Sequence, residues 1–469
     1  MRRFVLHRLS VNVPCSAWRI LLAVSWLLAE PGSARAELRF YPPPGDLAGC
    51  AHLRANKDYT VRVNGKPCFV YETEDYWDRS TEARPDKVAF VLFSFKDQPV
   101  TVDITCAFPA KAVTVRPTSF GIRARRRRNR ITLTLARPRK ISVEVNNRKR
   151  PLFIFADAPD EPDTEAHHYF GPGVHRIGPK YKLGADERLY IAGGAVLEGT
   201  LLMNGPNIKV RGRGILNAGH VTAERWRKDK RLSILSGAGR CDKLEISGLC
   251  LMNSPGWFTA SLSGDNAILR NLKVIGWLGL TDGPSMYGSH TIHEDCFVFC
   301  NDDVLKLNVK SHWVVRNHVI WKGPYGRVFG SLAGGKTPAE NITVENIDVI
   351  CDEGGVNDRS AVFAIYRIHA KNKRKRGNKK NCTFRNIRVE GPRKAPFIYF
   401  DARGFEVRNF TFENIRLADH NEYEGRIRAA GDGLIDGLHF KSVTLGGTRI
   451  RDLAEANVAV TGAVHNITF

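Results

Sequence analysis

The chain is poor in acidic residues: 48 Asp and Glu stand against 71 Lys and Arg, which leaves a formal charge of +23 over 469 residues. So basic a protein attracts polyanions to its surface. Beyond residue 36 the sequence lacks an apolar run long enough to cross a bilayer, so we expect no membrane span in the mature chain. It also lacks paired cysteines at metal-ligand spacing, since Cys296-x3-Cys300 has no second pair. We therefore expect neither a metal nor another cofactor.

Residues 1–36 are typical of an export signal. Basic residues precede the apolar run 20–29, and Ala34-Arg35-Ala36 offers a cleavage site between small residues. A membrane anchor is the alternative, but the run is short for a span. Removing the segment takes away five Arg and one Glu and lowers the net charge to about +19. We expect a secreted or periplasmic monomer.

The excess positive charge suggests a partner. For an exported protein, an acidic or sulfated polysaccharide is a more natural polyanion than nucleic acid. Much of the charge lies in runs, which are also typical of solvated loops: 125–128, 225–231 and 371–380.

Cysteines and sequons leave alternatives open. Nine cysteines remain after residue 36, an odd number that forbids complete pairing. Cys50, Cys68 and Cys106, or Cys296 with Cys300, could form bridges, whereas others would pack as small apolar residues. Sequons that we attribute to chance occur at Asn341, Asn381, Asn409 and Asn466.

A short pattern recurs from about residue 208 to the end of the chain. Apolar and polar residues alternate on both sides of a pivot residue, which is Gly, Asn, Asp or Ser. These residue types tolerate a sharp bend or a left-handed backbone conformation. The pivots lie at positions 212, 248, 271, 295, 317, 346, 386, 414 and 442.

The alternation on each flank is typical of short strands with one buried face. Strand, bend and strand repeated at roughly 22 to 28 residues predict a right-handed parallel β-helix. Its stacked strands would lie about 4.8 Å apart, so the pivots should form a ladder. A propeller would need longer repeats with hairpins, and leucine-rich repeats would need helical segments.

The amino-terminal third has a different texture. Residues 37–156 contain evenly spaced alternating strands, which predict an antiparallel β-sandwich. The acidic, proline-containing segment 157–168 has the composition of a linker, and 169–469 should form the coil. The predicted fold class is all-β: a right-handed single-stranded parallel β-helix preceded by a smaller antiparallel β-sandwich domain.

Three aspartates follow the pivots of two consecutive repeats. Asp282 stands in Thr-Asp-Gly, and Asp302 and Asp303 form a pair twenty residues later. If the pivots stack, the two segments lie one above the other, and clustered carboxyls should raise the pKa of at least one of them. A protonated acid beside an ionised base is what hydrolysis of a glycosidic bond requires.

The structural alternative is that these aspartates only cap turns. Strand alternation would also send the side chains of Asp302 and Asp303 to opposite faces unless a bulge intervenes, and a buried carboxylate without a partner is costly. Three acids on neighbouring coils nevertheless favour catalysis over capping.

The motifs Asn253-Ser-Pro-Gly-Trp257, Thr281-Asp282-Gly283 and Asn301-Asp302-Asp303-Val304-Leu305-Lys306 resemble β-helical glycoside hydrolases of family 28, the polygalacturonases, and family 49, the dextranases and isopullulanases. The likeness covers about residues 169–450 and is closer to family 49. It implies that Asp302 is the general acid, that Asp282 and Asp303 hold and deprotonate water, and that the product is inverted.

The next coil departs from polygalacturonases. Gly323-Pro-Tyr-Gly-Arg327 stands where that resemblance implies Gly-His-Gly, and no clear Arg-x-Lys follows. Lys306 and Arg327 could bind an anionic sugar or pair with the aspartates. The candidate sugar-stacking aromatics, which coil edges also use for packing, are Trp257, Trp277 and Tyr325.

We therefore predict a secreted glycoside hydrolase that cleaves O-glycosidic bonds in a polysaccharide by inversion, dextranase-like or polygalacturonase-like. Two alternatives stay open. A polysaccharide lyase shares the coil and would use a Lys or Arg base, often with Ca²⁺, on an anionic glycan. A non-catalytic β-helix would bind glycans, but it would not need clustered acids.

Overall fold

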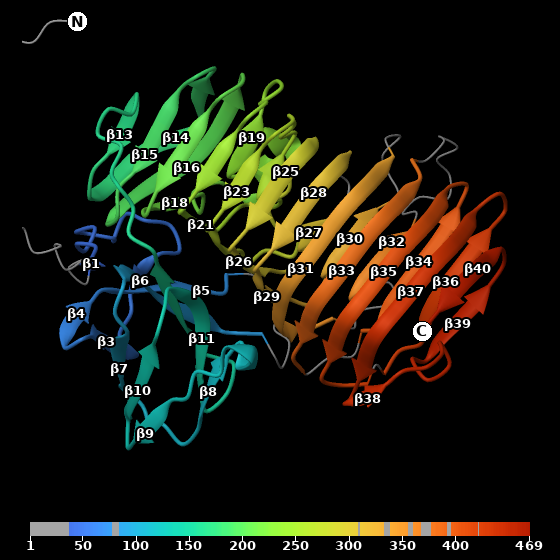
Figure 1. Cartoon of the computed structure of the whole chain (residues 1–469). Coiled ribbons are helices and arrows are strands. Elements are labelled where there is room, and N and C mark those ends of the chain that lie inside the picture. The colour runs from blue at the N-terminus through green and yellow to red at the C-terminus, as the bar shows by residue number, and fades with distance from the viewer. Residues whose placement is uncertain are drawn as a thin grey trace, which may run out of the picture. The chain divides into compact units, whose positions relative to one another are not determined.

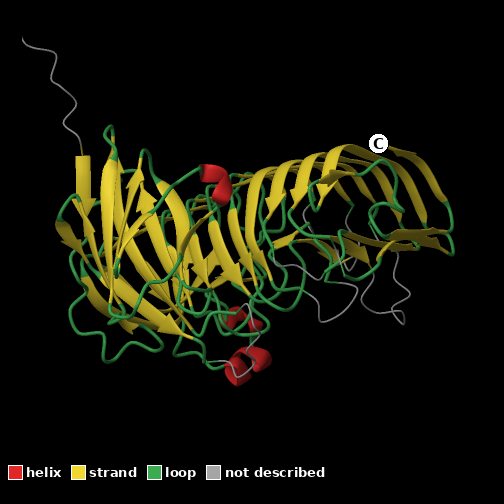
Figure 2. Ribbon diagram, turned by 90° about the horizontal axis from the view of Figure 1, so that it is seen from below, coloured by secondary structure: helices red, strands yellow, loops and turns green. Residues whose placement is uncertain are grey.

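The computed structural model describes residues 37–76, 84–307, 310–332, 338–354, 360–366, 377–391, 395–420 and 422–469. The predicted export signal and most of the basic run 371–380 lie outside them. Strands dominate the described chain, with one short α-helical segment, α1 (Ala223–Lys228), and the 3-10 turns η1 (Thr118–Phe120) and η2 (Lys230–Leu232) (Figure 2). Within the described residues, no helix has the length and apolarity needed to span a bilayer.

Two sheets at the amino-terminal end share one buried apolar core that includes Val91, Val102, Ile131 and Ile154. The first sheet contains, in pairing order, β2 (Arg54–Ala55), β5 (Val70–Glu74), β6 (Lys87–Lys96), β12 (Leu152–Asp157), β11 (Arg139–Val145) and β8 (Val113–Arg116), with β1 (Glu37–Phe40) also on β6. The second contains β4 (Lys66–Cys68), β3 (Tyr59–Val63), β7 (Val100–Cys106), β10 (Arg130–Leu135) and β9 (Arg125–Arg127).

The sandwich is built of antiparallel strand pairs, as predicted, except for one parallel pair. β12 runs parallel to β6, with Phe153 opposite Phe90. After β6 the chain builds β7 in the second sheet, returns to the first sheet with β8, and forms β9 and β10 in the second. It then returns through β11, which pairs antiparallel with β12. Short alternating strands do not reveal such a crossover, because alternation marks a buried face but not a partner.

The rest of the chain forms a coil of parallel strands, which confirms the predicted β-helix (Figure 1). Its long sheet contains β13 (His168–Phe170), β14 (Gly173–Gly184), β15 (Arg188–Ile191), β16 (Ala195–Asn204), β17 (Lys209–Gly212), β18 (Ile215–Asn217), β19 (Leu235–Gly237), β20 (Glu245–Ser247), β21 (Cys250–Met252), β22 (Thr259–Ala260), β23 (Ile268–Arg270), β24 (Lys273–Ile275), β25 (Ser289–Glu294), β26 (Phe297–Cys300), β28 (Ser311–Arg316), β29 (Val319–Lys322), β31 (Ala339–Asp352), β33 (Lys379–Val389), β35 (Glu406–Leu417), β37 (Leu434–Leu445), β38 (Thr448–Arg449) and β40 (Val464–Thr468). A further parallel sheet contains β27 (Leu305–Lys306), β30 (Phe329–Leu332), β32 (Phe363–Tyr366), β34 (Ile398–Arg403), β36 (Gly425–Ala430) and β39 (Val458–Thr461).

The predicted pivots stack in register. The non-glycine pivots, Asn271 to Ser442, all have φ between 52° and 60°. The residues that precede them are aligned from coil to coil, as in the pairs Arg385 with Glu345 and Glu413 with Arg385. Side-chain amides bridge the coils, since Asn414 Nδ2 donates to Asn386 Oδ1 at 2.7 Å. The ladder thus combines the left-handed backbone that Asn tolerates with hydrogen bonds between identical side chains.

A second row of left-handed residues explains the sequons. Asn341, Asn381, Asn409 and Asn466 have φ between 54° and 57° at another bend of the coil. Asn381 Nδ2 donates to Asn341 Oδ1 at 3.1 Å, and Asn409 Nδ2 donates to Asn381 Oδ1 at 3.2 Å. The bend therefore accounts for asparagine at these positions.

The amino-terminal sheets and the coil share buried contacts. Phe153 packs on Phe297, with ring centroids 4.7 Å apart, and the fully buried Lys273 places Nζ 2.6 Å from Asp157 Oδ2. Residues 36–469 form one compact unit by their contacts. The division into a sandwich at 37–156, a linker at 157–168 and a coil at 169–469 stays a prediction.

Every cysteine of the described residues is a free thiol. The bridges considered for Cys50, Cys68 and Cys106, and for Cys296 with Cys300, are absent there. Cysteines on coil strands are buried among apolar side chains, as expected of small apolar residues.

Candidate active site

One corner of the coil brings the three aspartates together. Asp302 N donates to Thr281 O at 3.1 Å, and Gly283 N donates to Asp303 O at 2.8 Å. The Thr-Asp-Gly segment and the aspartate pair therefore lie on adjacent coils, one above the other, as their spacing from the pivots predicts. Asp282 lies between β24 and β25, and the pair lies between β26 and β27.

The pair sits in a bend rather than on a strand. Regular pairing resumes only at Leu305, so strand alternation does not separate the side chains of Asp302 and Asp303. Gly326 on the next coil has φ 60°, and a Cβ there would lie 2.4 Å from Asp302 Oδ1. Glycine at this position therefore lets the next coil pass close to Asp302, because both the left-handed backbone and the short distance exclude a side chain.

The three carboxyls differ in burial and in the charges around them. Asp282 and Asp303 are 5% and 3% exposed, whereas Asp302 is half-buried. Burial, and then the charges of Asp282 and Asp303, raise the pKa of Asp302 to about 8. Burial also raises the pKa of Asp282, to about 6, and the charge of Lys306 opposes that rise. A carboxyl that keeps its proton at neutral pH thus stands beside Asp282, whose lower pKa lets it lose its proton first.

Lys306 and Arg327 supply the opposing charge. Lys306 Nζ lies 2.7 Å from Asp282 Oδ2, and Arg327 Nη1 lies 2.6 Å from Asp303 Oδ1. The Arg327 backbone N also donates to Asp303 Oδ1 at 3.1 Å. Lys306 and Arg327 therefore pair with the aspartates, which is one of the two roles that the sequence predicts for them, the other being to bind an anionic sugar.

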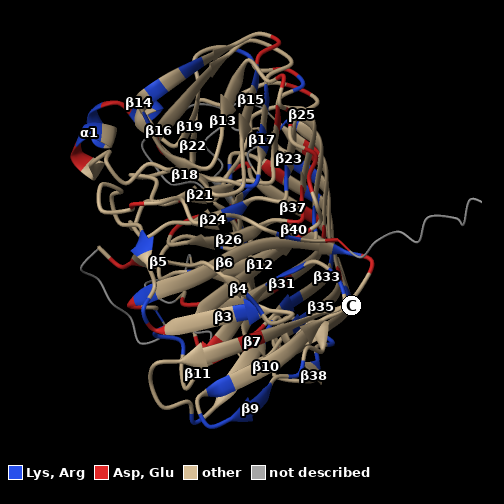
Figure 3. Ribbon diagram, turned by 90° about the vertical axis from the view of Figure 1, so that its left-hand side faces the viewer, with Lys and Arg blue, Asp and Glu red and all other residues tan. Residues whose placement is uncertain are grey.

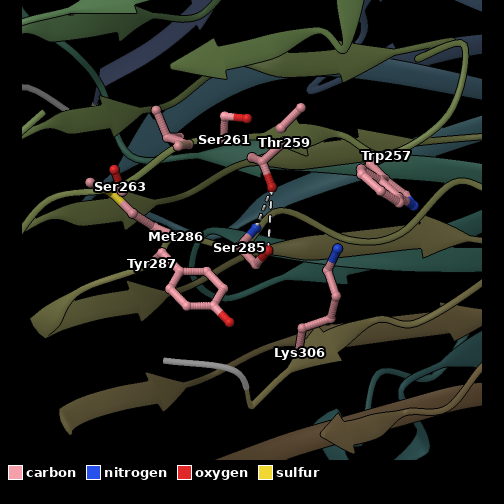
Figure 4. Close-up of a pocket in the computed structure, with 10 residues that line it drawn as sticks. Trp257, Thr259, Ser261, Ser263, Ser285, Met286, Tyr287 and Lys306 are labelled. Carbon is pink, nitrogen blue, oxygen red and sulfur yellow. Dashed lines mark hydrogen bonds between the residues drawn. The ribbon is translucent and has the colours of Figure 1, made fainter. Parts of the chain in front are cut away.

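A cavity of about 450 Å³ opens beside Lys306 (Figure 4). Hydroxyl groups line much of it, and Ser285 N donates to Thr259 Oγ1 at 3.0 Å across adjacent coils. Trp257, which is half-buried, lines the same cavity, and Lys306 Nζ lies 5.3 Å from its ring centroid. Hydroxyls, an exposed aromatic face and a cation suit a sugar ring better than an apolar ligand.

Sequence analysis missed the segment that holds Trp257. Trp226 of α1 packs edge-on against Trp257 with ring centroids 5.4 Å apart. Lys230 Nζ lies 3.4 Å from the Trp226 ring centroid and 5.6 Å from that of Trp257. The sequence signals only a basic run at 225–231, and nothing local to it indicates a contact with Trp257.

Trp277 does not lie where sugar could reach it, so its predicted stacking role is wrong. Its side chain is fully buried, and Nε1 donates to Thr73 Oγ1 of the sandwich at 3.0 Å. The buried Arg84 donates to the Trp277 backbone O at 2.7 Å. Packing against the amino-terminal sheets therefore explains this tryptophan.

Tyr325 lies half-buried in the coil that follows the aspartate pair, and its backbone N donates to Asn301 O at 3.0 Å. Tyr366, which sequence analysis did not consider, supports Arg327, whose guanidinium carbon lies 4.5 Å from the Tyr366 ring centroid. Tyr366 follows Arg327 by 39 residues, so only the stacking of β32 on β30 reveals this contact.

Among the described residues, no group of three or more His, Cys, Asp or Glu side chains has the arrangement of a metal site.

No family model matches the sequence, and no curated protein matches it. Solved structures are similar in fold at low identity. A family 28 exopolygalacturonase from Yersinia enterocolitica is 11% identical with a TM-score of 0.41, covering 92% of this chain and 96% of its own. An exopolygalacturonase from Thermotoga maritima is 15% identical with a TM-score of 0.37, covering 60% and 84%. A GH87 α-1,3-glucanase from Streptomyces thermodiastaticus is 12% identical with a TM-score of 0.30, covering 92% and 85%.

Proposed function

We propose that the protein is a glycoside hydrolase that cleaves O-glycosidic bonds in a polysaccharide with inversion. The observation that carries this proposal is the corner at Asp302, where a carboxyl with a raised pKa stands beside two carboxylates, each held by a cation. This is the division of labour that acetal hydrolysis needs. The motifs that resemble families 28 and 49 support the same assignment of roles.

In the proposed reaction, the Asp302 carboxyl gives its proton to the glycosidic oxygen while the bond from that oxygen to the anomeric carbon breaks. A water molecule bonds to the anomeric carbon from the opposite side, and Asp282 or Asp303 accepts the proton that the water loses. One water is consumed and two sugar chains leave. Lys306 opposes the rise in the pKa of Asp282, and Lys306 and Arg327 hold the two accepting carboxyls in place because each forms an ion pair with one of them.

We further propose that the polysaccharide is anionic. Lys230 has no ion pair with a carboxylate among the described residues, yet its ammonium lies beside the two tryptophans next to the cavity. Together with the net charge of +23, a cation without a carboxylate partner near Trp257, which lines the cavity, favours a sugar carrying carboxylate or sulfate. Replacing Lys230 by Met should then weaken turnover of an acidic glycan more than that of a neutral one. Lys228, which pairs with Glu224 on the same segment, is the matched control.

The basic amino-terminal segment and its apolar run support export, and the proposed enzyme acts outside the cytoplasm. Comparing the cellular fraction that holds the full chain with that of a variant lacking residues 1–36 tests this. Equal distribution of the two would refute export by this segment.

The central test is turnover of a panel containing polygalacturonate, α-1,3-glucan, dextran and a sulfated galactan, with release of reducing ends as the readout. Asp302→Asn should lower the rate on the glycan that is cleaved by about 10²–10⁴-fold. Asp295→Asn is the control, because Asp295 is a pivot with φ 56° and asparagine suits that backbone equally.

Two outcomes would contradict the proposal. If Asp302→Asn and Asp295→Asn cleave equally well, the assigned acid is wrong. If the product absorbs as an unsaturated uronate and chelation abolishes its formation, the protein is a lyase. NMR of freshly released product checks the stereochemistry, since retention of the anomeric configuration would refute the inverting mechanism.

A further inference from the structure

Another cavity, whose wall is largely apolar but holds charged side chains, lies at the start of the coil, apart from the candidate active site. Its volume is about 230 Å³, and its lining includes Arg176, Glu198, His220 and Arg225. Gly178 and Gly199 also line it, and a Cβ on Gly178 would meet no atom within 4 Å, so open space adjoins that residue. The proposed reaction uses none of these residues.

Glu198 is the unusual group in this cavity, because it carries a carboxyl and yet is almost completely buried. The residue is 2% exposed and its side chain 1%. Asn217 Nδ2 donates to its Oε1 at 2.7 Å. Oε2 lies 2.8 Å from His220 Nε2 but receives no hydrogen bond of good geometry. Burial raises the pKa of Glu198 above its usual range. The Cys50 side chain and the Ala51 backbone also interact with this carboxyl. Oε2 still has room for a well-aligned donor, and the hydroxyls of a sugar are such donors.

Cations from two different elements face the same space. Arg176 belongs to β14 and Arg225 to α1, both of which carry Lys or Arg (Figure 3). Neither arginine forms an ion pair among the described residues, and both line the cavity. Arg176 is placed against the backbone of Gly49, where a Cβ would lie 2.0 Å from its Nη2. A guanidinium without a carboxylate partner suits a carboxylate or sulfate on a ligand. The cavity therefore presents a hydroxyl acceptor together with anion donors.

The register of the coil sets the distance between this cavity and the aspartates. Glu198 pairs with Asn217, which aligns in turn with Met252, Ile275 and Phe299. Phe299 lies on β26 and comes three residues before Asp302, which follows in the next bend. Four steps of stacked strands at about 4.8 Å give a separation of roughly 19 Å along the axis. A glycan of several sugar rings spans such a distance, whereas a disaccharide does not.

We propose that the cavity of Arg176, Glu198, His220 and Arg225 is a distal subsite that binds an acidic sugar ring of the same polysaccharide that is cleaved at Asp302. This inference rests on the proposed function, because it assumes that the chain binds a glycan along this edge of the coil. Glu198 accepts hydrogen bonds from ring hydroxyls, His220 orients Glu198, and the two arginines bind the carboxylate or sulfate. The subsite should therefore favour long acidic chains over short ones.

The test is binding to Asp302→Asn, which removes turnover, measured by calorimetry. The probes are oligogalacturonides and carrageenan oligosaccharides of about two and about eight rings, with isomalto-oligosaccharides of the same lengths as neutral probes. Adding His220→Ala or Arg225→Ala should weaken binding of a long acidic probe about tenfold, the effect of losing one hydrogen bond to a charged group. Binding of the two-ring probes should not change. Arg227→Ala, an exposed arginine of the same helix that does not line the cavity, is the control and should leave all affinities unchanged.

Three results would overturn the subsite. His220→Ala and Arg225→Ala could match Arg227→Ala on the long acidic probes, the variants could weaken short and long probes equally, or none of the probes could bind. The comparison of carboxylated with sulfated probes identifies the anion. This result is independent of the test of the proposed function. Weaker binding of long probes in the His220→Ala variant would support the subsite, even if the turnover assay showed that Asp302 is not the general acid. Glu198→Gln distinguishes a binding role of the carboxyl from a structural one. The amide keeps the shape of the side chain, but its NH2 group is a donor and cannot accept a hydrogen bond from a sugar hydroxyl as the carboxylate oxygen does. A melting curve checks that the variant is folded.

Discussion

Replacing Lys306 by Met should move the acid limb of the pH–rate profile upward. Lys306 Nζ lies 2.7 Å from Asp282 Oδ2. Burial raises the pKa of Asp282 to about 6, and Lys306 exerts the largest opposing effect. An opposite charge at this range lowers a carboxyl pKa by about 1 to 3 pH units, so the variant should bring the pKa of Asp282 to between about 7 and about 9.

The sign and size of the effect on rate follow from the role of Asp282. If its carboxylate accepts the proton from water, activity rises with pH as Asp282 ionises. At pH 6 about half of the wild-type protein carries ionised Asp282, whereas about a tenth to a thousandth of the variant does. The rate at pH 6 should therefore fall about 5- to 500-fold.

The assay is the initial rate on the cleaved glycan between about pH 4 and pH 9, with melting curves to confirm folding. Lys310→Met is the control, because Lys310 is a half-buried lysine that interacts with Asp242 and Asp265 rather than with the catalytic aspartates. A folded Lys306→Met whose acid limb stays in place, or moves to lower pH, would refute the assignment of Asp282 as proton acceptor.

Other substitutions test stability and packing. The pKa of Asp302 is about 8 in the folded protein and about 4 in the unfolded chain, so between these pH values the unfolded chain ionises Asp302 and the folded protein loses stability as pH rises. Asp302→Asn should therefore melt above the wild type at pH 8 and converge with it near pH 4. Equal melting temperatures at pH 8 would contradict this. Trp277→Ala should lower the free energy of unfolding in urea by about 3–5 kcal/mol without changing the KM of the folded enzyme. A raised KM with unchanged stability would instead indicate that Trp277 binds sugar. Asn386→Ala should lose about 1–2 kcal/mol because φ is 56° there, whereas Asn386→Gly should lose less; equal losses would mean that the side-chain ladder, not the backbone, dominates.

The sequence by itself determined the coil. Asn, Asp and Gly at regular intervals between alternating strands mark left-handed bends, and this local chemistry suffices because each bend depends on its own residue. The spacing from pivots also placed Asp282 next to Asp302 and Asp303, since stacking converts a sequence separation of one coil into contact. Lys306 and Arg327 came instead from comparing the motifs with the families that they resemble.

Only the tertiary structure decided the roles of residues whose partners lie many coils away or on another sheet. The same aromatic residue type lines a cavity at position 257 and fills a buried contact at 277, because the amino-terminal sheets cover Trp277 and not Trp257. The direction of β12, the support of Arg327 by Tyr366, and the meeting of Arg176 with Glu198 and His220 likewise depend on how distant segments pack. Local patterns specify which backbone conformations are favourable, but burial and contacts are set by the rest of the chain, and these govern the pKa values and accessibility on which function depends.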